Sequence, residues 1–335
     1  MCIRDRISVI GPTSWGTTLA VINAREGHDV TLIARSEKEA RSLDQPRENF
    51  RFLPGTTLPA NLHITSSLDE GLGRAEIVVI AVPSSTLRQN ANTIRDSLDS
   101  QTTVVTATKG LEVGSRKRMS EVLLDELPSS FANRVCALSG PNLAREIILG
   151  KPASTVVASP NTDTAKFVQS IMNSTTFRIY TNTDMVGVEL AGALKNIIAI
   201  GAGIADGLQF GDNSKAGLMT RGLAEITRLG IAAGAKPETF AGLAGMGDLI
   251  ATCSSTLSRN HQVGVELAKG IHLKEILAKM LHVAEGVDTT AAARSMAHDL
   301  KVDMPITETT YQMLFEGLSA DHAVTRLMDR KPVSE

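Results

Sequence analysis

The chain has 335 residues, enough for two domains and a sizeable core. Its 34 Lys and Arg residues nearly balance its 36 Asp and Glu residues, so charge gives no reason to expect a nucleic acid or an anionic membrane as a partner. The three cysteines, Cys2, Cys136 and Cys253, follow no metal-ligand spacing, and their odd number does not suggest a disulfide framework. We therefore expect no metal site, and reduced thiols in a cytoplasmic protein.

Two segments bear on targeting. The most apolar run, 197–205, is about half the length that a bilayer requires, so we predict no integral membrane segment. Residues 1–6 resemble a translated adapter more than a native start, and we exclude them from the functional interpretation.

The first half of the chain alternates short β-branched runs with helical patterns, beginning with a helix expected at 15–26. The predicted strands are 7–10, 28–34, 77–82, 103–108, 135–138, 154–158 and 177–180. This alternation predicts an α/β fold with a doubly wound, mainly parallel, Rossmann-like sheet covered on both faces.

The pattern changes near residue 183, where long helical periodicities replace the strands. The expected helices are 186–205, 213–234, 262–269, 289–300 and 307–316. We therefore predict a dinucleotide-binding domain over 1–185 and an all-α substrate and catalytic domain over 186–335.

A glycine-rich turn, GPTSWG at 11–16, follows the first predicted strand and opens a helix. Gly11 would allow the tight turn, and Gly16 would let the helix approach the strand, so that backbone N–H groups could bind a pyrophosphate. Thr13 stands where the usual fingerprint has its middle glycine, and its side chain would push the pyrophosphate outward or tilt it. A plain strand-to-helix turn is the alternative.

The second predicted strand ends at Arg35 and Ser36, about twenty residues after the glycines. An acidic residue there would bind the ribose 2′-hydroxyl of NAD, whereas Arg35 and Ser36 suit the 2′-phosphate of NADP. A solvated arginine is the alternative. We favour NADPH as the cofactor and leave NADH open.

Lys195 lies in an otherwise apolar helical stretch, 188–201. Burial penalises the charged form of an amine, which suits a group that both gives and takes a proton. The alternative is a lysine whose amine reaches solvent from an amphipathic helix.

Eight short segments, taken in chain order, carry a family resemblance. They are SWGT at 14–17, ATKGLE at 107–112, SGP at 139–141, LKN at 194–196, GMGDL at 245–249, SRN at 258–260, EG at 285–286 and MPI at 304–306. Each is modest alone, but the ordered set, which spans residues 7–331, resembles the NAD(P)-dependent glycerol-3-phosphate dehydrogenase family of bacterial type.

The resemblance implies reversible reduction of dihydroxyacetone phosphate to sn-glycerol 3-phosphate with NADH or NADPH, for glycerophospholipid synthesis. It implies that Lys195 is the catalytic proton donor in reduction and acceptor in oxidation. The candidate substrate-binding residues are Lys109, Gly140, Asn142, Lys195, Asn196, Asp248, Thr252, Ser258, Arg259 and Asn260. From the glycine-rich turn, the second strand and the resemblance together, the candidate cofactor-binding residues are Gly11, Ser14, Trp15, Gly16, Arg35, Lys109, Ala144, Arg259, Val283 and Glu285.

Several of these residues have plainer interpretations. Asn142 departs from the family, in which many relatives carry Ser or Thr, although asparagine still donates and accepts hydrogen bonds. Asp248 could be a helix N-cap, and Arg259 could be a solvated arginine at a helix start. His261 is expected to lie in solvent.

Two other functions compete with this dehydrogenase. The first is another two-domain hydroxy-acid or ketopantoate-type reductase, against which the phosphate-binding pair Arg259 and Asn260 argues. The second is a non-catalytic dinucleotide sensor, which would need none of Lys109, Lys195 and Asp248. The oligomeric state stays open, with a homodimer among the candidates.

Overall fold

The computed structural model describes residues 5–280 and 283–331. The chain folds as two compact units. The first comprises residues 1–109 and 119–188, and the second comprises 110–118 and 189–335. Of the expected foreign segment 1–6, residues 1–4 lie outside the described residues, whereas Arg6 begins the first strand.

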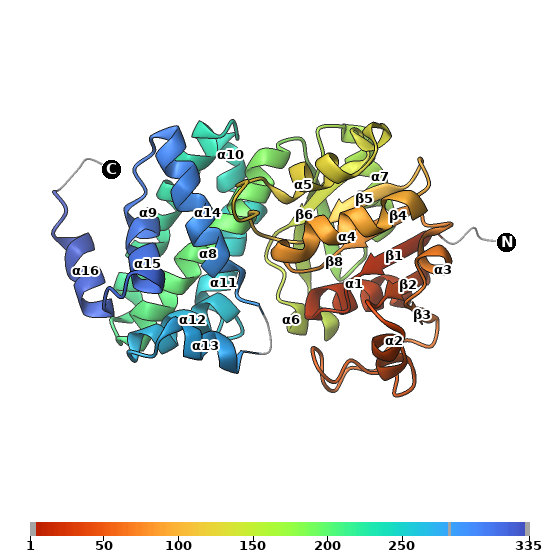
Figure 1. Ribbon diagram of the computed structural model, residues 1–335, viewed down its shortest axis with the longest axis horizontal. Helices are drawn as coiled ribbons and strands as arrows, with labels where there is room; N and C mark the ends of the chain where they lie inside the picture. The colour runs from red at the N-terminus through yellow and green to blue at the C-terminus, as the bar shows by residue number, and fades with distance from the viewer. Residues whose placement is uncertain (1–4, 281–282, 332–335) are drawn as a thin grey trace. The chain divides into compact units, whose positions relative to one another are not determined.

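The first unit is built on one eight-stranded sheet with the order β3-β2-β1-β4-β5-β6-β7-β8 (Figure 1). Its strands are β1 (Arg6–Ile10), β2 (Asp29–Ile33), β3 (Leu62–Thr65), β4 (Ile77–Ile80), β5 (Thr103–Thr106), β6 (Val135–Ser139), β7 (Ala153–Ala158) and β8 (Phe177–Asn182). Neighbouring strands are parallel except β6 and β7, which pair antiparallel. The predicted doubly wound, mainly parallel sheet is confirmed.

Helices cover both faces of this sheet. They are α1 (Ser14–Arg25), α2 (Glu37–Asp44), α3 (Leu68–Leu72), α4 (Leu87–Ile94), α5 (Met119–Glu126), α6 (Ala144–Ile148) and α7 (Thr162–Met172). One buried core joins strand side chains to α1, α6 and α7, and a second joins the opposite strand face to α4 and α5. All four residues of β4 are buried, as its β-branched sequence predicts for a strand covered on both sides.

Strand β3 is the strand that the sequence did not predict. It has four residues, it alternates with the polar His63 and Thr65, and it lies at the edge of the sheet. So short a run carries too little periodicity to separate a strand from a loop.

The second unit is helical throughout its named elements within the described residues, which confirms the predicted all-α half. Its helices are α8 (Met185–Gly207), whose first turn belongs to the first unit, α9 (Gly211–Ala232), α10 (Pro237–Phe240), α11 (Asp248–Ser254), α12 (Arg259–Ala268), α13 (Leu273–Lys279), α14 (Glu285–Leu300), α15 (Pro305–Phe315) and α16 (Ala320–Met328). The sequence did not predict α10, α11, α13 and α16, because elements of fewer than ten residues show less than three turns of an apolar stripe.

Helix α8 is buried along most of its length, and its Ile200 and Ile204 belong to the apolar core of the second unit. By length and composition it is the one described helix that could cross a membrane, but 89% of its most apolar window is buried inside the protein. This burial is the pattern of a core helix, so α8 gives no reason to expect a membrane span.

The segment 110–118 comes from the first half of the sequence but belongs to the second unit. Arg118 forms a largely buried ion pair of 2.6 Å with Glu189 on α8. Arg116 lies 2.9 Å from Asp299 on α14. These two ion pairs hold the segment against the helices.

Candidate active site

The glycine-rich turn joins β1 to α1 at the carboxyl edge of the sheet. Gly11 has a φ of +97°, a backbone conformation that glycine adopts readily and other residues rarely do. A Cβ atom on Gly16 would collide with the carbonyl oxygen of Gly11. Turn and helix therefore approach each other as closely as a dinucleotide-binding turn requires.

Thr13 has a defined place in this turn. It is the N-cap of α1, where its Oγ1 accepts a hydrogen bond from Gly16 N at 3.1 Å and donates one to Ala81 O at 2.9 Å. The hydroxyl thus ties the start of α1 to the end of β4. Its φ of −73° is ordinary, so replacing the middle glycine causes no backbone strain here.

The start of α1 fits the dinucleotide that the motif and the resemblance imply. The helix has 12 residues, and its N-terminal N–H groups and dipole suit a pyrophosphate. The indole Nε1 of Trp15 is a buried donor with no partner among the described residues, while the Ser14 hydroxyl donates to Phe52 O at 3.0 Å.

Arg35 follows β2, and its side chain is 72% exposed. Its guanidinium lies 3.2 Å from the Glu39 carboxylate, one turn along the chain. Ser36 is the N-cap of α2 and accepts a hydrogen bond from Glu39 N at 3.3 Å. An exposed arginine with a surface ion pair stays accessible to a phosphate, whereas Ser36 already has a structural role.

A second group of predicted residues lies where β5 and β6 end. Lys109 Nζ donates to Gly140 O at 2.8 Å. Asn142 Nδ2 donates to Thr155 Oγ1 at 3.1 Å, and its buried Oδ1 has no partner among the described residues. Ala144, also predicted, is the first residue of α6. The first unit therefore brings Lys109, Gly140 and Asn142 to one edge of the sheet.

Lys195 is buried in α8, with only 6% of its surface exposed, so the alternative of a solvent-reaching lysine is wrong. Its Nζ donates to Asp248 Oδ1 at 2.7 Å and to Thr252 Oγ1. Thr252 also donates to Asp248 Oδ1 at 3.1 Å. The second unit thus brings together three residues that the sequence named separately.

The local fold explains how Asp248 reaches this position. A π-helical turn at Leu243–Gly247 leads into α11, and such turns are frequent at functional sites. Gly247 is the N-cap of α11 and Asp248 its first residue, so the N-cap alternative for Asp248 is wrong. One turn later, Thr252 shares the helix face of Asp248.

Asn196 and Asn260 hydrogen-bond each other at 2.9 Å, from Asn260 Nδ2 to Asn196 Oδ1. Asn260 Oδ1 also accepts from Gly286 N at 3.0 Å, at the start of α14. Ser258 is the N-cap of α12. These residues therefore connect the starts of α12 and α14 to α8.

Arg259 begins α12 and is exposed. Its guanidinium donates to Val283 O at 2.8 Å. Desolvation by neighbouring protein lowers the pKa of Arg259, and the carboxylate of Glu285 opposes that shift. Because the side chain is exposed and a guanidinium is protonated in proteins under ordinary conditions, we expect Arg259 to stay charged.

His261 lies in the interior, and the expectation that it is solvated is wrong. It is only 5% exposed, and its Nε2 lies 2.8 Å from Asp206 Oδ2. Lys215 donates to both oxygens of the same carboxylate, at 2.9 and 3.0 Å. Burial opposes ionisation of Asp206, but the hydrogen bonds from Lys215 and His261 lower its pKa. No local pattern predicts this pair, because His261 and Asp206 are far apart along the chain.

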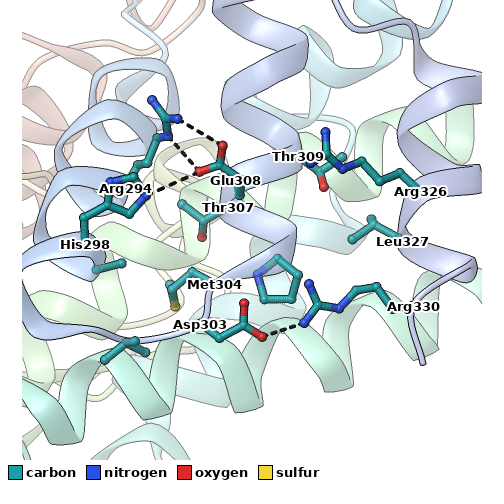
Figure 2. A pocket seen from close by; sticks show the side chains of 13 residues that line it. Arg294, His298, Asp303, Met304, Thr307, Glu308, Thr309, Arg326, Leu327 and Arg330 are labelled. Atoms are coloured by element: carbon teal, nitrogen blue, oxygen red, sulfur yellow. Dashed lines mark hydrogen bonds and ion pairs between the residues drawn. The ribbon is translucent and has the colours of Figure 1, made fainter. Parts of the chain in front are cut away.

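The buried cysteines and a hollow in the second unit are two further features, and neither includes residues of the predicted catalytic site. Burial raises the pKa of Cys136 and of Cys253 to about 12, so both thiols stay protonated. A hollow between α14, α15 and α16, lined by both polar and apolar side chains, is shown in Figure 2. Its three arginines bond within the protein, Arg294 to Glu308, Arg326 to Gln312 and Arg330 to Asp303. None of the predicted site residues lines the hollow.

Comparison with known proteins identifies the family. The family model described as NAD-dependent glycerol-3-phosphate dehydrogenase N-terminus matches residues 6–165, and the corresponding C-terminus model matches 184–325. The chain belongs to the NAD-dependent glycerol-3-phosphate dehydrogenase family. As the predicted motifs implied, membership of this glycerol-3-phosphate dehydrogenase family extends over both units.

Individual members of the glycerol-3-phosphate dehydrogenase family match nearly end to end. The chain is 49% identical to a glycerol-3-phosphate dehydrogenase (NAD(P)+) of Dehalococcoides mccartyi, over 99% of this chain and 92% of the relative. It is 47% identical to the enzyme of that name from Chlorobium luteolum, over 98% and 99%. A crystal structure of glycerol-3-phosphate dehydrogenase from Coxiella burnetii superposes with a TM-score of 0.92 at 36% identity, covering 98% of this chain and 99% of that one.

Proposed function

We propose that this protein reduces dihydroxyacetone phosphate to sn-glycerol 3-phosphate, reversibly, with NADH or NADPH as the hydride donor. The observation that carries the proposal is the buried cluster of Lys195, Asp248 and Thr252. It lies in a chain that shares almost half of its residues with enzymes named for this reaction.

A nicotinamide dinucleotide, when bound, supplies the hydride for such a reduction. As the ketone is reduced, negative charge develops on its oxygen and needs a proton and nearby positive charge. Lys195 provides both in this proposal, as proton donor in reduction and acceptor in oxidation. Asp248 and Thr252 hold the amine in one orientation, which keeps its rotamers from averaging over unproductive positions.

The phosphate of the substrate is assigned to Arg259. Its planar fork of donors matches phosphate oxygens, and the hydrogen bond to Val283 O leaves other N–H groups for a ligand. Asn260 acts through its bonds to Asn196 and Gly286, which fix the helix start that carries Arg259. A phosphate site favours this substrate over ketopantoate, which carries no phosphate.

The cofactor is assigned to the start of α1 and to Arg35. We propose that NADPH is preferred over NADH, because Arg35 is exposed at the end of β2, where no acidic residue takes its position. A cytoplasmic role in supplying the glycerol backbone of phospholipids is part of the same proposal.

Following NADPH absorbance with three mixtures tests the function. Oxidation is expected with dihydroxyacetone phosphate and not with ketopantoate. Turnover of ketopantoate alone would favour the hydroxy-acid reductase, and tight NADPH binding without turnover of either ketone would favour a sensor. A mixture without ketone measures the background.

A further inference from the structure

Helices α8 and α12 cross at backbone contact. A Cβ atom on Gly203 would collide with His261 O, and one on Gly264 would collide with Ile200 O. The two glycines therefore let the helices approach until main chain meets main chain, so bonds that hold the helices at this contact fix their spacing.

Polar contacts lie along both sides of this crossing. Asn196 and Asn260 bond at 2.9 Å on one side. On the other side the buried His261 bonds Asp206 at 2.8 Å, and Lys215 of α9 holds the same carboxylate. Asp206, His261 and Lys215 are outside the predicted active site, and the reaction described above uses none of them.

The crossing joins the helix that carries the proton-transferring amine of Lys195 to the helix that carries the phosphate-binding guanidinium of Arg259. Lys195 precedes Asn196 in α8, and Arg259 precedes Asn260 in α12. The residues that follow Lys195 and Arg259 are therefore hydrogen-bonded directly to each other. Lys195 must reach the ketone oxygen while Arg259 holds the phosphate. One CH₂ group separates the carbonyl carbon from the phosphate ester oxygen in dihydroxyacetone phosphate, so the spacing of the two groups selects the length of the substrate.

We propose that the His261–Asp206 bond is a positioning contact that holds α12 on α8 and thereby makes the enzyme selective for a ketone with one CH₂ group before its phosphate ester. This inference rests on the proposed roles of Lys195 and Arg259. A misplacement of about 1 Å can cost about a hundredfold in rate, so loosening the crossing should change the selectivity between substrates of different length.

The test compares dihydroxyacetone phosphate with 1-hydroxy-2-butanone 4-phosphate, which has one more CH₂ group. In His261→Ala and in Asp206→Asn, the ratio of kcat/KM for the short over the long ketone is expected to fall about tenfold. His261→Gln, whose side-chain amide can still donate to Asp206, is expected to keep the ratio within about twofold of wild type. Inorganic phosphate, as a competitive inhibitor, is expected to keep its KI in all three variants, because Arg259 is unchanged.

Arg259→Ala is the opposing control, since it is expected to raise the KI of inorganic phosphate. Circular dichroism and thermal melting check the fold, and Asp206→Asn carries the test if His261→Ala is unfolded, because Asp206 is partly exposed. An unchanged substrate ratio, an equal fall for both ketones, or unfolding of both variants would overturn the positioning role. A wild-type protein that does not reduce dihydroxyacetone phosphate would instead refute the proposed function before any variant is compared.

Discussion

At the scale of single residues, Thr13 links the cofactor turn to the sheet through two hydrogen bonds. Thr13→Val keeps the shape of the side chain and loses both hydrogen bonds, so the start of α1 should lose about 1 kcal/mol of stability. We expect NADPH to bind more weakly to Thr13→Val and as in wild type to Thr13→Ser. Trp15 is the single tryptophan of the chain, so its fluorescence can measure the dissociation constant.

The outcome with Thr13→Gly separates two interpretations of this position. Weaker binding would agree with the capping role of the hydroxyl. Tighter binding would show that the threonine side chain displaces the pyrophosphate, as its place in the fingerprint suggests, and would contradict the prediction for Thr13→Val.

Arg35 offers a test of cofactor preference. Arg35→Asp puts a negative charge where the 2′-phosphate is assigned, so the KM for NADPH should rise about tenfold or more while the KM for NADH changes little. Arg41→Asp is a matched control, because Arg41 is also exposed and paired with a glutamate on α2. Equal NADPH to NADH ratios of kcat/KM in wild type and Arg35→Asp would place the 2′-phosphate elsewhere.

Site residues can be predicted from the sequence where their signal lies within a short stretch of the chain. Lys195 stands out because it is charged within an apolar helical stretch, and Thr252 follows Asp248 by one helical turn. His261 and Asp206 lie 55 positions apart in the sequence and on two different helices, so no local sequence pattern predicts their contact. Burial of such a histidine depends on tertiary packing. For this reason the sequence predicts a solvent-exposed His261, and the prediction is wrong.

At the scale of secondary-structure elements, Glu225 of α9 joins that helix to the start of α15. Its buried carboxylate accepts hydrogen bonds from Ile306 N, Thr307 N and Thr307 Oγ1, each at 2.8 Å. Two of these donors are backbone groups that the first turn of a helix leaves without intrahelical partners. The cap of α15 is thus supplied by another helix and not by a neighbouring residue.

Glu225→Ala should lower the free energy of unfolding by about 2 to 4 kcal/mol, because it leaves two buried N–H groups without acceptors. Urea denaturation measures the change, and Glu238→Ala, an exposed glutamate on α10, should change it by less than about 0.5 kcal/mol. A loss for Glu225→Ala no larger than that of the control would show that water or a shifted side chain replaces the cap.

The same carboxyl group should make stability depend on pH. Burial raises the pKa of Glu225 above its ordinary value of 4.5, although the hydrogen bonds to α15 oppose the shift. The folded state then keeps the proton at a pH where the unfolded state has lost it, so this contribution is complete below pH 4.5 and is lost as the pH rises through the folded-state pKa. The unfolding free energy of wild type minus that of Glu225→Gln should therefore decrease across this window. A difference that increases with pH would contradict the raised pKa.

At the scale of the whole molecule, the change from strand-and-helix alternation to helices alone reveals the two architectures. The α/β half and the helical half follow from periodicity, because each depends on patterns that repeat within short windows. Periodicity does not predict that segment 110–118 belongs to the second unit. Its ion pairs are with Glu189 and Asp299, which are both distant from it in sequence. Long-range ion pairs of this kind have no signature in composition or spacing.

The amine of Lys195 is assigned as the proton-transfer group, and the most direct test of this role is kcat for dihydroxyacetone phosphate in Lys195→Met. Removing the amine leaves the buried Asp248 without this partner, so the double variant Lys195→Met with Asp248→Asn separates lost stability from lost chemistry. Trp15 fluorescence should show that both variants bind NADPH with the affinity of wild type. The kcat of each variant should fall by about a hundredfold or more. Lys269→Ala, an exposed lysine of the second unit, should leave kcat unchanged. A folded Lys195→Met that retains about a third of the wild-type kcat, too small a loss for a missing general acid, would contradict the assignment of Lys195 as the proton-transfer group.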